Sequence, residues 1–408
     1  MNSEKLFLLT GFAGSGKTTV LSAVMKAYIL SLRYGKVALT AVSNKAVKVM
    51  RKMARQMGFE DSVECLTCTK ILGLKPQIDK DGKQEFVSDR DKEPTVTDYK
   101  VVVVDECSML GADLFNRLLR EVDGFLSETK IIFCGDSAQL RPVKEEMSPV
   151  FSAVPEGNRA DLTEVVRYDG AVGITAEAIR STPDWGRAPI IHTGTNEDKS
   201  KGVIQIKDSQ HLEKLIIRAF GSRRYQEDPD SAKIICYTNA EVDRYNALVH
   251  RSIYGQGAPR FAEGLRLIAQ SPIMIGNTVV MSTSEECEVR SVREGEVEGW
   301  RVWRLDVKID EVAKERSVSV LHEDEESRFA SKLDELRAMK DWRTFWDLKQ
   351  MFAHLKPCYA ITAHKSQGST YSDAFILLQG ILRCRNIAER QELAYVAFSR
   401  PKNRAFYL

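Results

Sequence analysis

Short, uninterrupted apolar runs alternate with helical patterns along the N-terminal part of the chain. The runs of strand length are Leu6–Leu9, Val37–Ala41, Val101–Val104 and Ile131–Cys134. Runs that are apolar at every position suit strands buried on both faces of a parallel sheet. Between the first two runs, Val20, Val24 and Tyr28 repeat at helical spacing. This strand–helix–strand rhythm predicts an α/β fold.

A second α/β rhythm begins near Gly202 and resumes at the C-terminus. Its expected elements are strands at Val203–Ile206, Ile234–Cys236, Tyr359–Ile361, Phe375–Leu378 and Ala405–Tyr407, and a helix at Glu241–Arg251. The stretch 259–352 differs from its surroundings. Thr278–Met281 and Trp300–Val307 indicate antiparallel strands, and Glu323–Trp346 indicates a charged helix. We therefore expect a separate β domain inserted into the second α/β domain.

Residues 76–97 interrupt the first α/β rhythm with a mostly polar segment. A proline stands near each end, and Asp81-Gly82 supplies the turn signal of a β-hairpin. Phe86 is its one aromatic residue. The segment is predicted to be a small hairpin that extends from the sheet.

Composition restricts the class of protein without identifying it. The chain has 408 residues, of which 43% are hydrophobic and 28% charged, and its formal net charge is +2. These values are typical of a folded, soluble protein and exclude a global electrostatic attraction to nucleic acid. No apolar run reaches the roughly 18 residues of a membrane span. The N-terminus does not resemble an export signal, and the 8 cysteines are scattered, so a cytoplasmic location is expected.

A glycine-rich sequence follows the first predicted strand and opens the first predicted helix. Gly11-Phe-Ala-Gly-Ser-Gly-Lys17-Thr18 fits the pattern G-x-x-x-x-G-K-[ST] in full. Such a loop surrounds a polyphosphate with backbone N–H groups, while the lysine reaches the β- and γ-phosphates and the hydroxyl binds Mg²⁺. A chance glycine-rich turn is the disfavoured alternative. The residues predicted to bind the nucleotide here are Gly11, Ala13, Gly14, Ser15, Gly16, Lys17, Thr18 and Thr19.

Carboxylates follow the apolar run Val101–Val104, at the strand end where open α/β sheets bind ligands. Asp105 is expected to hold Mg²⁺ together with Thr18, and Glu106 to orient or deprotonate the attacking water. Plain helix capping is the alternative. Gln139 follows the strand Ile131–Cys134 and is placed to contact the γ-phosphate, although an ordinary β–α turn would explain it as well.

Taken together, these elements resemble those of superfamily 1 helicases, and the C-terminal half strengthens the likeness. The string Ala363-His-Lys-Ser-Gln-Gly-Ser369 resembles motif V of that family, and Tyr395-Val-Ala-Phe-Ser-Arg400 resembles motif VI. Within the superfamily the motifs are most similar to the 5′→3′ branch, superfamily 1B, and to its RecD-like and phage Dda-like members. The resemblance covers nearly the whole chain and implies two RecA-like domains, a hairpin pin and an SH3-like insertion.

The resemblance also implies a domain plan. Domain 1A would comprise 1–165 with hairpin 1B at 76–97, domain 2A would comprise 166–258 and 353–408, and the SH3-like domain 2B would comprise 259–352.

By the same resemblance, arginine residues approach the γ-phosphate from the far side of the cleft. Arg167 and Arg400 occupy the positions of these arginine fingers, and Gly368 belongs to the same nucleotide site. Phosphoryl transfer requires such neutralisation of the developing charge. The alternative is that each arginine is a surface or ion-pair residue. Family members read adenine with a glutamine upstream of the first strand, and no glutamine stands there in this sequence, so base selectivity is left open.

The resemblance further implies a track for single-stranded DNA, built from short polar side chains and helix N-termini that contact phosphates without reading sequence. The residues assigned to it are Ser43, Asn44, Lys45, Thr67, Thr238, Asn239, His364 and Ser366, with Phe86 at the tip of the strand-separating pin. Simple helix capping is the alternative for each polar residue, and a packed hydrophobic plug is the alternative for Phe86.

The sequence thus predicts an ATP- and Mg²⁺-dependent DNA helicase that moves 5′→3′ on single strands and opens duplexes at single/double-strand junctions. We expect a monomer without membrane contact, with single-strand-binding or replisome proteins as candidate partners. A DNA-stimulated ATPase switch that binds strands without processive unwinding remains open. A small-molecule P-loop kinase ranks last, because it has no use for motifs V and VI.

Overall fold

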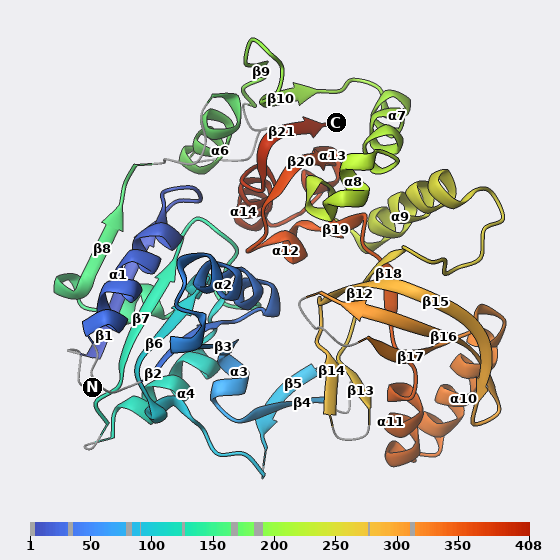
Figure 1. The fold of residues 1–408 in the computed structure, drawn as a ribbon, viewed down its shortest axis with the longest axis horizontal. Coiled ribbons are helices and arrows are strands. Elements are labelled where there is room, and N and C mark those ends of the chain that lie inside the picture. The colour runs from blue at the N-terminus through green and yellow to red at the C-terminus, as the bar shows by residue number, and fades with distance from the viewer. Residues whose placement is uncertain are drawn as a thin grey trace. The chain divides into compact units, whose positions relative to one another are not determined.

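The computed structural model describes residues 5–31, 36–78, 84–89, 91–124, 127–164, 170–182, 191–275, 278–310 and 315–408 (Figure 1). The chain divides into two compact units. The first unit comprises residues 1–212, 235–237 and 362–408, and the second comprises 213–234 and 238–361.

The first sheet is entirely parallel, with the strand order β3-β2-β6-β7-β1-β8. Its strands are β1 (Leu6–Gly11), β2 (Lys36–Ala41), β3 (Val63–Thr67), β6 (Tyr99–Asp105), β7 (Lys130–Gly135) and β8 (Arg159–Leu162). Alternate residues of β6 enter separate hydrophobic clusters, Val101 with Met25 and Met50, and Val102 with Phe115. Both faces of the sheet are therefore buried, which confirms the prediction from its continuous apolar runs.

Helices cover the two faces of this sheet (Figure 1). They are α1 (Lys17–Ser31), α2 (Asn44–Met57), α3 (Cys68–Ile71), α4 (Ala112–Val122) and α5 (Val150–Ala153). Helix α2 has a defined start and end: the Ser43 hydroxyl accepts the Ala46 N–H, and Gly58 ends the helix at φ 72°. The left-handed φ explains the glycine, because a Cβ is disfavoured there.

The predicted hairpin is present in the first unit as β4 (Leu74–Ile78) and β5 (Gln84–Ser88). The strands pair antiparallel, with Pro76 opposite Phe86. The Asp81-Gly82 turn lies outside the described residues.

The second α/β sheet has the strand order β19-β11-β20-β21-β10-β9. Its strands are β9 (Gly194–Thr195), β10 (Gly202–Gln205), β11 (Ala232–Cys236), β19 (Ala360–Thr362), β20 (Tyr371–Ile376) and β21 (Pro401–Tyr407). Strand β21 pairs parallel with β20 and β10, whereas β9 pairs antiparallel with β10. The helices of this part are α6 (Ala171–Ser181), α7 (Ser209–Phe220), α8 (Arg223–Glu227), α9 (Asn239–Tyr254), α12 (Ala363–Ser366), α13 (Leu378–Ile381) and α14 (Ile387–Phe398). The second α/β rhythm is thus confirmed.

An antiparallel sheet of the second unit interrupts this α/β fold, as predicted. Its order is β17-β16-β15-β12-β18, and its strands are β12 (Arg266–Ala269), β15 (Glu286–Val297), β16 (Trp300–Ile309), β17 (Arg316–Leu321) and β18 (Leu355–Pro357). Strands β13 (Ile273–Ile275) and β14 (Thr278–Met281) form a separate antiparallel pair.

The charged helical stretch expected over Glu323–Trp346 is present, and the chain divides it into α10 (Glu326–Ala338) and α11 (Trp342–Gln350). Lys340 between them has a left-handed φ of 57°, and the Asp341 side chain caps α11 by accepting the Thr344 N–H. Phe345 is buried in a cluster with Trp300 and Phe329, and Trp342 and Trp346 pack against that cluster. Phe345 is therefore a core residue, and Trp342 and Trp346 line the edge of the same core.

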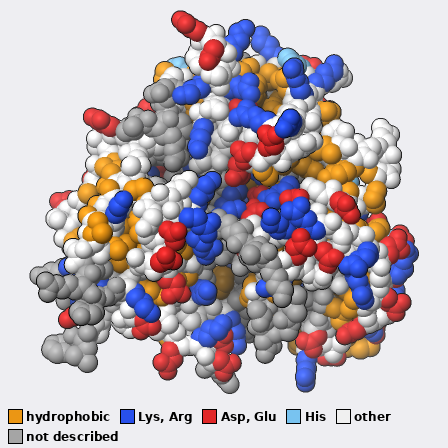
Figure 2. Space-filling view, viewed as in Figure 1, with side chains coloured by type: hydrophobic (Ala, Val, Ile, Leu, Met, Phe, Trp, Pro, Cys, Tyr) orange, Lys and Arg blue, Asp and Glu red, His pale blue; other side chains and the backbone are white. Residues whose placement is uncertain are grey.

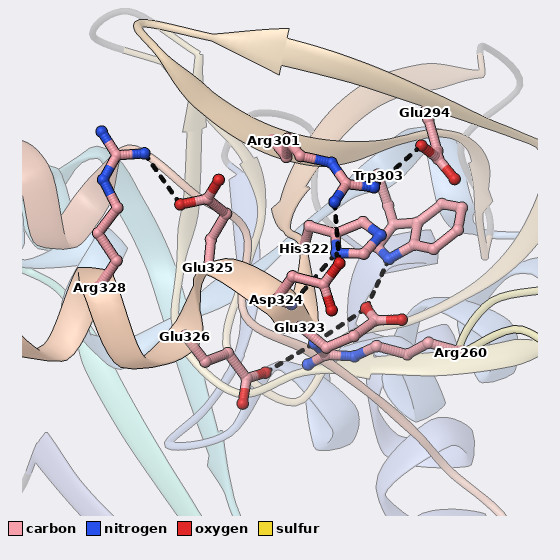
Figure 3. Close-up of polar contacts among 10 residues, drawn as sticks. All are labelled: Arg260, Glu294, Arg301, Trp303, His322, Glu323, Asp324, Glu325, Glu326 and Arg328. Carbon is pink, nitrogen blue, oxygen red and sulfur yellow. Dashed lines mark hydrogen bonds and ion pairs between the residues drawn. The ribbon is translucent and has the colours of Figure 1, made fainter.

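Charged contacts fasten the start of α10 to the antiparallel sheet (Figure 3). Trp303 of β16 stacks on His322 and donates its indole N–H to Glu323 at 2.7 Å. Nearby ion pairs join Arg260 to Glu326, Arg301 to Asp324 and Arg328 to Glu325 at 2.8–3.0 Å. Exposed pairs of this kind contribute little each, so we assign the anchoring mainly to the buried stack.

Candidate functional site

The loop between β1 and α1 has the backbone geometry of a phosphate-binding loop. Gly14 and Gly16 have φ values of 84° and 86°, which side chains with a Cβ rarely adopt. A Cβ on Gly11 would lie 2.4 Å from the Ser15 hydroxyl oxygen, so the tight turn requires glycine. The Lys17 ammonium donates to the Gly11 and Phe12 carbonyls at 2.5 and 3.0 Å, which places its charge at the mouth of the loop.

The predicted acidic pair stands at the carboxyl end of β6, one strand away from β7 and two from β1. Asp105 accepts the Glu106 N–H at 2.9 Å. Glu106 has a left-handed φ of 52°, unusual for a non-glycine residue and a feature that often marks functional sites.

Loss of solvent raises the pKa of both carboxyl groups. For Asp105 the nearby Lys17 ammonium partly opposes this rise in pKa. For Glu106 the charge of Asp105 raises the pKa further, whereas Arg400 and Lys17 lower it. The pair therefore faces converging positive charge, as phosphate chemistry at this position requires.

Beyond β7 the chain supplies a buried polar group that supports Gln139. Asp136 is 1% exposed, and its carboxylate accepts the Ala138 N–H at 3.0 Å and the Gln139 side-chain amide at 3.3 Å. The adjoining Gly135 has no room for a side chain, because a Cβ would lie 2.5 Å from the Cys107 sulfur.

Arg400 follows α14 and is 5% exposed. Its guanidinium donates to the Val396 and Ser369 carbonyls and to the Ser399 hydroxyl at 2.8–3.1 Å. Arg400 is thus bound by residues of the part of the unit that contains the second sheet. Its positive charge lowers the pKa of Glu106. Arg167 lies outside the described residues.

Sequence reasoning missed two residues that link the halves of this unit. Gln367 lies 3.4 Å from both the Glu106 carboxylate and the Ser108 hydroxyl, and it donates its side-chain amide to them. Tyr395 accepts the Ala13 N–H and donates to Asp136, both at 2.8 Å. Both residues lie inside the motif V and VI strings, but nothing in the strings shows which side chain faces the loop.

The donor set fits a nucleotide with a single divalent cation. Mg²⁺ bound together with phosphates takes one or two protein carboxylates and keeps several waters. Asp105 and Thr18 suit that role, and among the described residues no cluster of three or more His, Cys, Asp or Glu offers an all-protein metal cage. Three buried polar atoms without a protein partner belong to residues of this site, namely Ser15 Oγ, Gln139 Oε1 and Gln367 Oε1. Such orphaned atoms indicate a site that a polar ligand completes.

Among the described residues, five helix N-termini carry a hydroxyl cap, one of them Ser222 at α8, and three of these caps were assigned to the DNA track. Ser43, Thr67 and Thr238 accept N–H groups at the starts of α2, α3 and α9, as Thr362 does at α12. Capping and phosphate contact are compatible, because the remaining N–H groups of a helix start stay available to anions. Asn44 and Asn239 are the first residues of their helices.

The other predicted DNA contacts have defined neighbours. Lys45 donates to the Tyr371 hydroxyl at 2.7 Å, and His364 lies 3.5 Å from Glu389. Burial lowers the pKa of His364, and Glu389 partly opposes this. Ser366 is fully buried and donates to the Ala363 carbonyl, so its hydroxyl points away from solvent in this conformation.

Phe86 projects from the hairpin strand β5 with 37% of its surface exposed.

Figure 2 shows Lys and Arg side chains interspersed with Asp and Glu over the viewed face, in keeping with the small net charge. Within the described ranges, no helix is both long enough and apolar enough to cross a membrane.

Comparison with known proteins finds similar sequences along the whole chain. Residues 1–145 match a family model described as an AAA domain. The ATP-dependent DNA helicase Dda of Enterobacteria phage T4 is 25% identical over 98% of this chain and 93% of its own length. An uncharacterised protein of Acanthamoeba polyphaga mimivirus, R530, is 24% identical over the full chain and 96% of its own length.

Solved structures show the same fold. A Bacteroides Pif1 helicase in complex with ADP-AlF3 and single-stranded DNA matches with a TM-score of 0.52 and 16% identity, covering 100% of this chain and 89% of that one. Pif1 from Candida albicans matches with a TM-score of 0.51 and 15% identity, covering 98% and 90%. At these identities the likeness carries the fold: two parallel, RecA-like sheets with an antiparallel insertion.

Proposed function

Because this chain is a distant, full-length homologue of superfamily 1B DNA helicases of the Dda and Pif1 type, we propose that it uses ATP to move 5′→3′ along single-stranded DNA and to open duplexes. The observation that supports this most is a nucleotide site with contributions from two sheets. Gln367 and Tyr395, from the second sheet's side, contact Glu106 and Ala13 of the first. A small-molecule kinase would leave the residues of motifs V and VI without a role.

The chain's own residues have distinct roles in hydrolysis. The amides of the Gly11–Thr18 loop and the Lys17 ammonium bind the phosphates, and Glu106 orients the attacking water and takes its proton. Mg²⁺, held by Thr18 and Asp105, would neutralise charge on the β- and γ-phosphates. Gln139, fixed by Asp136, contacts the γ-phosphate through its amide.

Arginines supply the positive charge opposite Lys17. Arg400 approaches the γ-phosphate from the motif VI side, and the family resemblance of its sequence segment proposes Arg167 as the second such arginine. Bound ATP then draws the two α/β parts together, and loss of the γ-phosphate releases them. Such an opening cycle follows from contacts that exist in only one of two states.

We propose that the two α/β parts bind the DNA strand in turn during this cycle. The capped starts of α2 and α3 would hold phosphates on the first part, and those of α9 and α12 on the second, with Lys45 and His364 adding side-chain contacts. Backbone contacts of this type are independent of base sequence. A strand that is held alternately by the two parts moves by one step in each cycle.

The hairpin β4–β5 is proposed to separate the strands. Opening a base pair costs about 1.4 kcal/mol of stacking on average, and Phe86, exposed on β5, would fill the gap left by the parted bases. In the same scheme the antiparallel insertion is the SH3-like domain 2B, and because β18 pairs with β12 in its sheet, this domain extends past the expected limit at residue 352.

A comparison of duplexes tests this function. A duplex with a 5′ single-stranded overhang should open at least about tenfold faster with ATP than one with a 3′ overhang. Neither should open without ATP. Equal opening of both, or a preference for the 3′ overhang, would refute the direction. ATP hydrolysis without opening of either would favour a DNA-stimulated switch.

A further inference from the structure

A single hydroxyl group joins the phosphate loop to the motif VI helix. Tyr395 lies on α14, is 2% exposed and belongs to the core cluster of the second sheet. Its hydroxyl accepts the Ala13 N–H and donates to the Asp136 carboxylate, both at 2.8 Å. Burial raises the pKa of Tyr395, so the hydroxyl stays protonated and able to donate.

Each partner of this hydroxyl is itself part of the nucleotide site. Ala13 stands in the loop whose carbonyls receive the Lys17 ammonium. Asp136 holds the Gln139 side chain with the same oxygen that accepts from Tyr395. A shift of α14 would therefore move both the loop and the Gln139 side chain.

Further contacts connect α14 to the part of the unit that contains the first sheet. Glu392, one turn before Tyr395, pairs with Arg141 through two hydrogen bonds at 2.5 and 2.8 Å. Arg180 of α6 lies 3.4 Å above the Phe12 ring, and α6 is tied to α14 because Gln391 donates to the Ile179 carbonyl at 2.8 Å. Of these contacts, only Tyr395 combines the loop backbone with Asp136.

The other end of α14 leads toward the strand-binding candidates. His364 of α12 lies 3.5 Å from Glu389, in the first turn of α14. A chain of direct contacts thus runs from His364 through α14 and Tyr395 to Ala13. Energetic coupling between two sites requires a physical connection of this kind and an element with two arrangements.

We infer that Tyr395 is a positioning residue whose hydroxyl couples strand binding at α12 to the geometry of the phosphate loop. The inference rests on the proposed function, because it presumes that strands bind at α12. With the hydroxyl in place, α14, Ala13 and Asp136 move as one body. Without it, strand and nucleotide bind independently.

The test is a linkage measurement with the substitution Tyr395→Phe. The affinity of the full chain for a single-stranded oligonucleotide is measured with and without a non-hydrolysable ATP analogue. In the unaltered protein the two dissociation constants differ, and their ratio is the coupling factor. In Tyr395→Phe we expect this coupling factor to fall about tenfold, as loss of a hydrogen bond to a carboxylate implies. If the factor of the unaltered protein is below ten, we expect it to fall to one.

Tyr407→Phe is the matched control, since Tyr407 is 6% exposed in the same core cluster. It should keep the coupling factor. The double substitution with Asp136→Asn should add less than the sum of its parts, because both changes remove one interaction. An unchanged ratio in Tyr395→Phe would overturn the inference, and so would an equal fall of the ratio in Tyr407→Phe. Failure of the unaltered protein to bind strands would instead refute the proposed function.

Discussion

Replacing Lys17 with Ala should reduce kcat/KM for ATP hydrolysis about 10²- to 10³-fold while leaving single-strand binding within about twofold. The ammonium group lies at the mouth of the loop, bound to the Gly11 and Phe12 carbonyls. Removing a charged group that stabilises the transferring phosphoryl in a low-dielectric site costs about 3–4 kcal/mol, which corresponds to this loss. Steady-state hydrolysis with saturating strand measures the first effect, and fluorescence anisotropy of a labelled strand measures the second.

Lys26→Ala provides the control on the same helix, because Lys26 is exposed on α1. It removes one positive charge without touching the loop and should hydrolyse ATP at the normal rate. Continued hydrolysis by Lys17→Ala would mean that the β1–α1 loop is not the phosphate site. Loss of strand binding in that variant would show that the loop has a wider structural role.

Shortening the hairpin within residues 78–90 should abolish duplex opening but leave strand-stimulated ATP hydrolysis within about threefold. The hairpin pairs only with itself in the sheets, and no residue assigned to the nucleotide lies in it. A wedge lowers the barrier for parting bases, whereas hydrolysis depends on the loop and the arginines. Opening of a forked duplex and hydrolysis are measured on the same preparation.

A milder change separates Phe86 from the hairpin as a whole, and the pairing of Phe86 with Pro76 corrects its predicted place, because it lies in the middle of β5 and not at the tip. Phe86→Ala should slow opening about tenfold, since stacking on an aromatic ring contributes about 1–3 kcal/mol per base. Met339→Ala, which truncates another exposed apolar side chain, should have no effect. Opening that survives hairpin shortening would rule out the wedge, and equal loss of opening and hydrolysis would indicate a purely structural hairpin.

The sequence predicted the central strands of the first sheet because their signal is local, whereas the edge strands β3 and β8 were missed. Residues of β6 such as Val102 and Val103 alternate between two buried faces, so apolar side chains are required at every position. The hairpin was recognised from its turn signal. The break between α10 and α11 was missed, since it depends on a left-handed Lys340 and on the Asp341 cap, which charge patterning does not reveal.

The candidate site was only partly predictable, and the reason is distance along the chain. The Gly11–Thr18 loop and Asp105 each follow a strand, so their spacing alone indicates their chemistry. Tyr395 and Gln367 act through contacts with Ala13 and Glu106 hundreds of residues away, and no local pattern encodes which residue of α14 faces the loop. Likewise, Ser366 at the end of α12 is buried, and this burial depends on tertiary packing, which the motif sequence does not reveal.

Directional movement along a single strand tests the central claim most directly. An oligonucleotide carrying a tightly bound protein block at its 3′ end is compared with one blocked at its 5′ end, each with and without ATP. If hydrolysis between Lys17 and the arginines drives 5′→3′ stepping, only the 3′ block should be displaced, and only when ATP is present. Displacement of the 5′ block alone, or of neither block while ATP is consumed, would contradict the account.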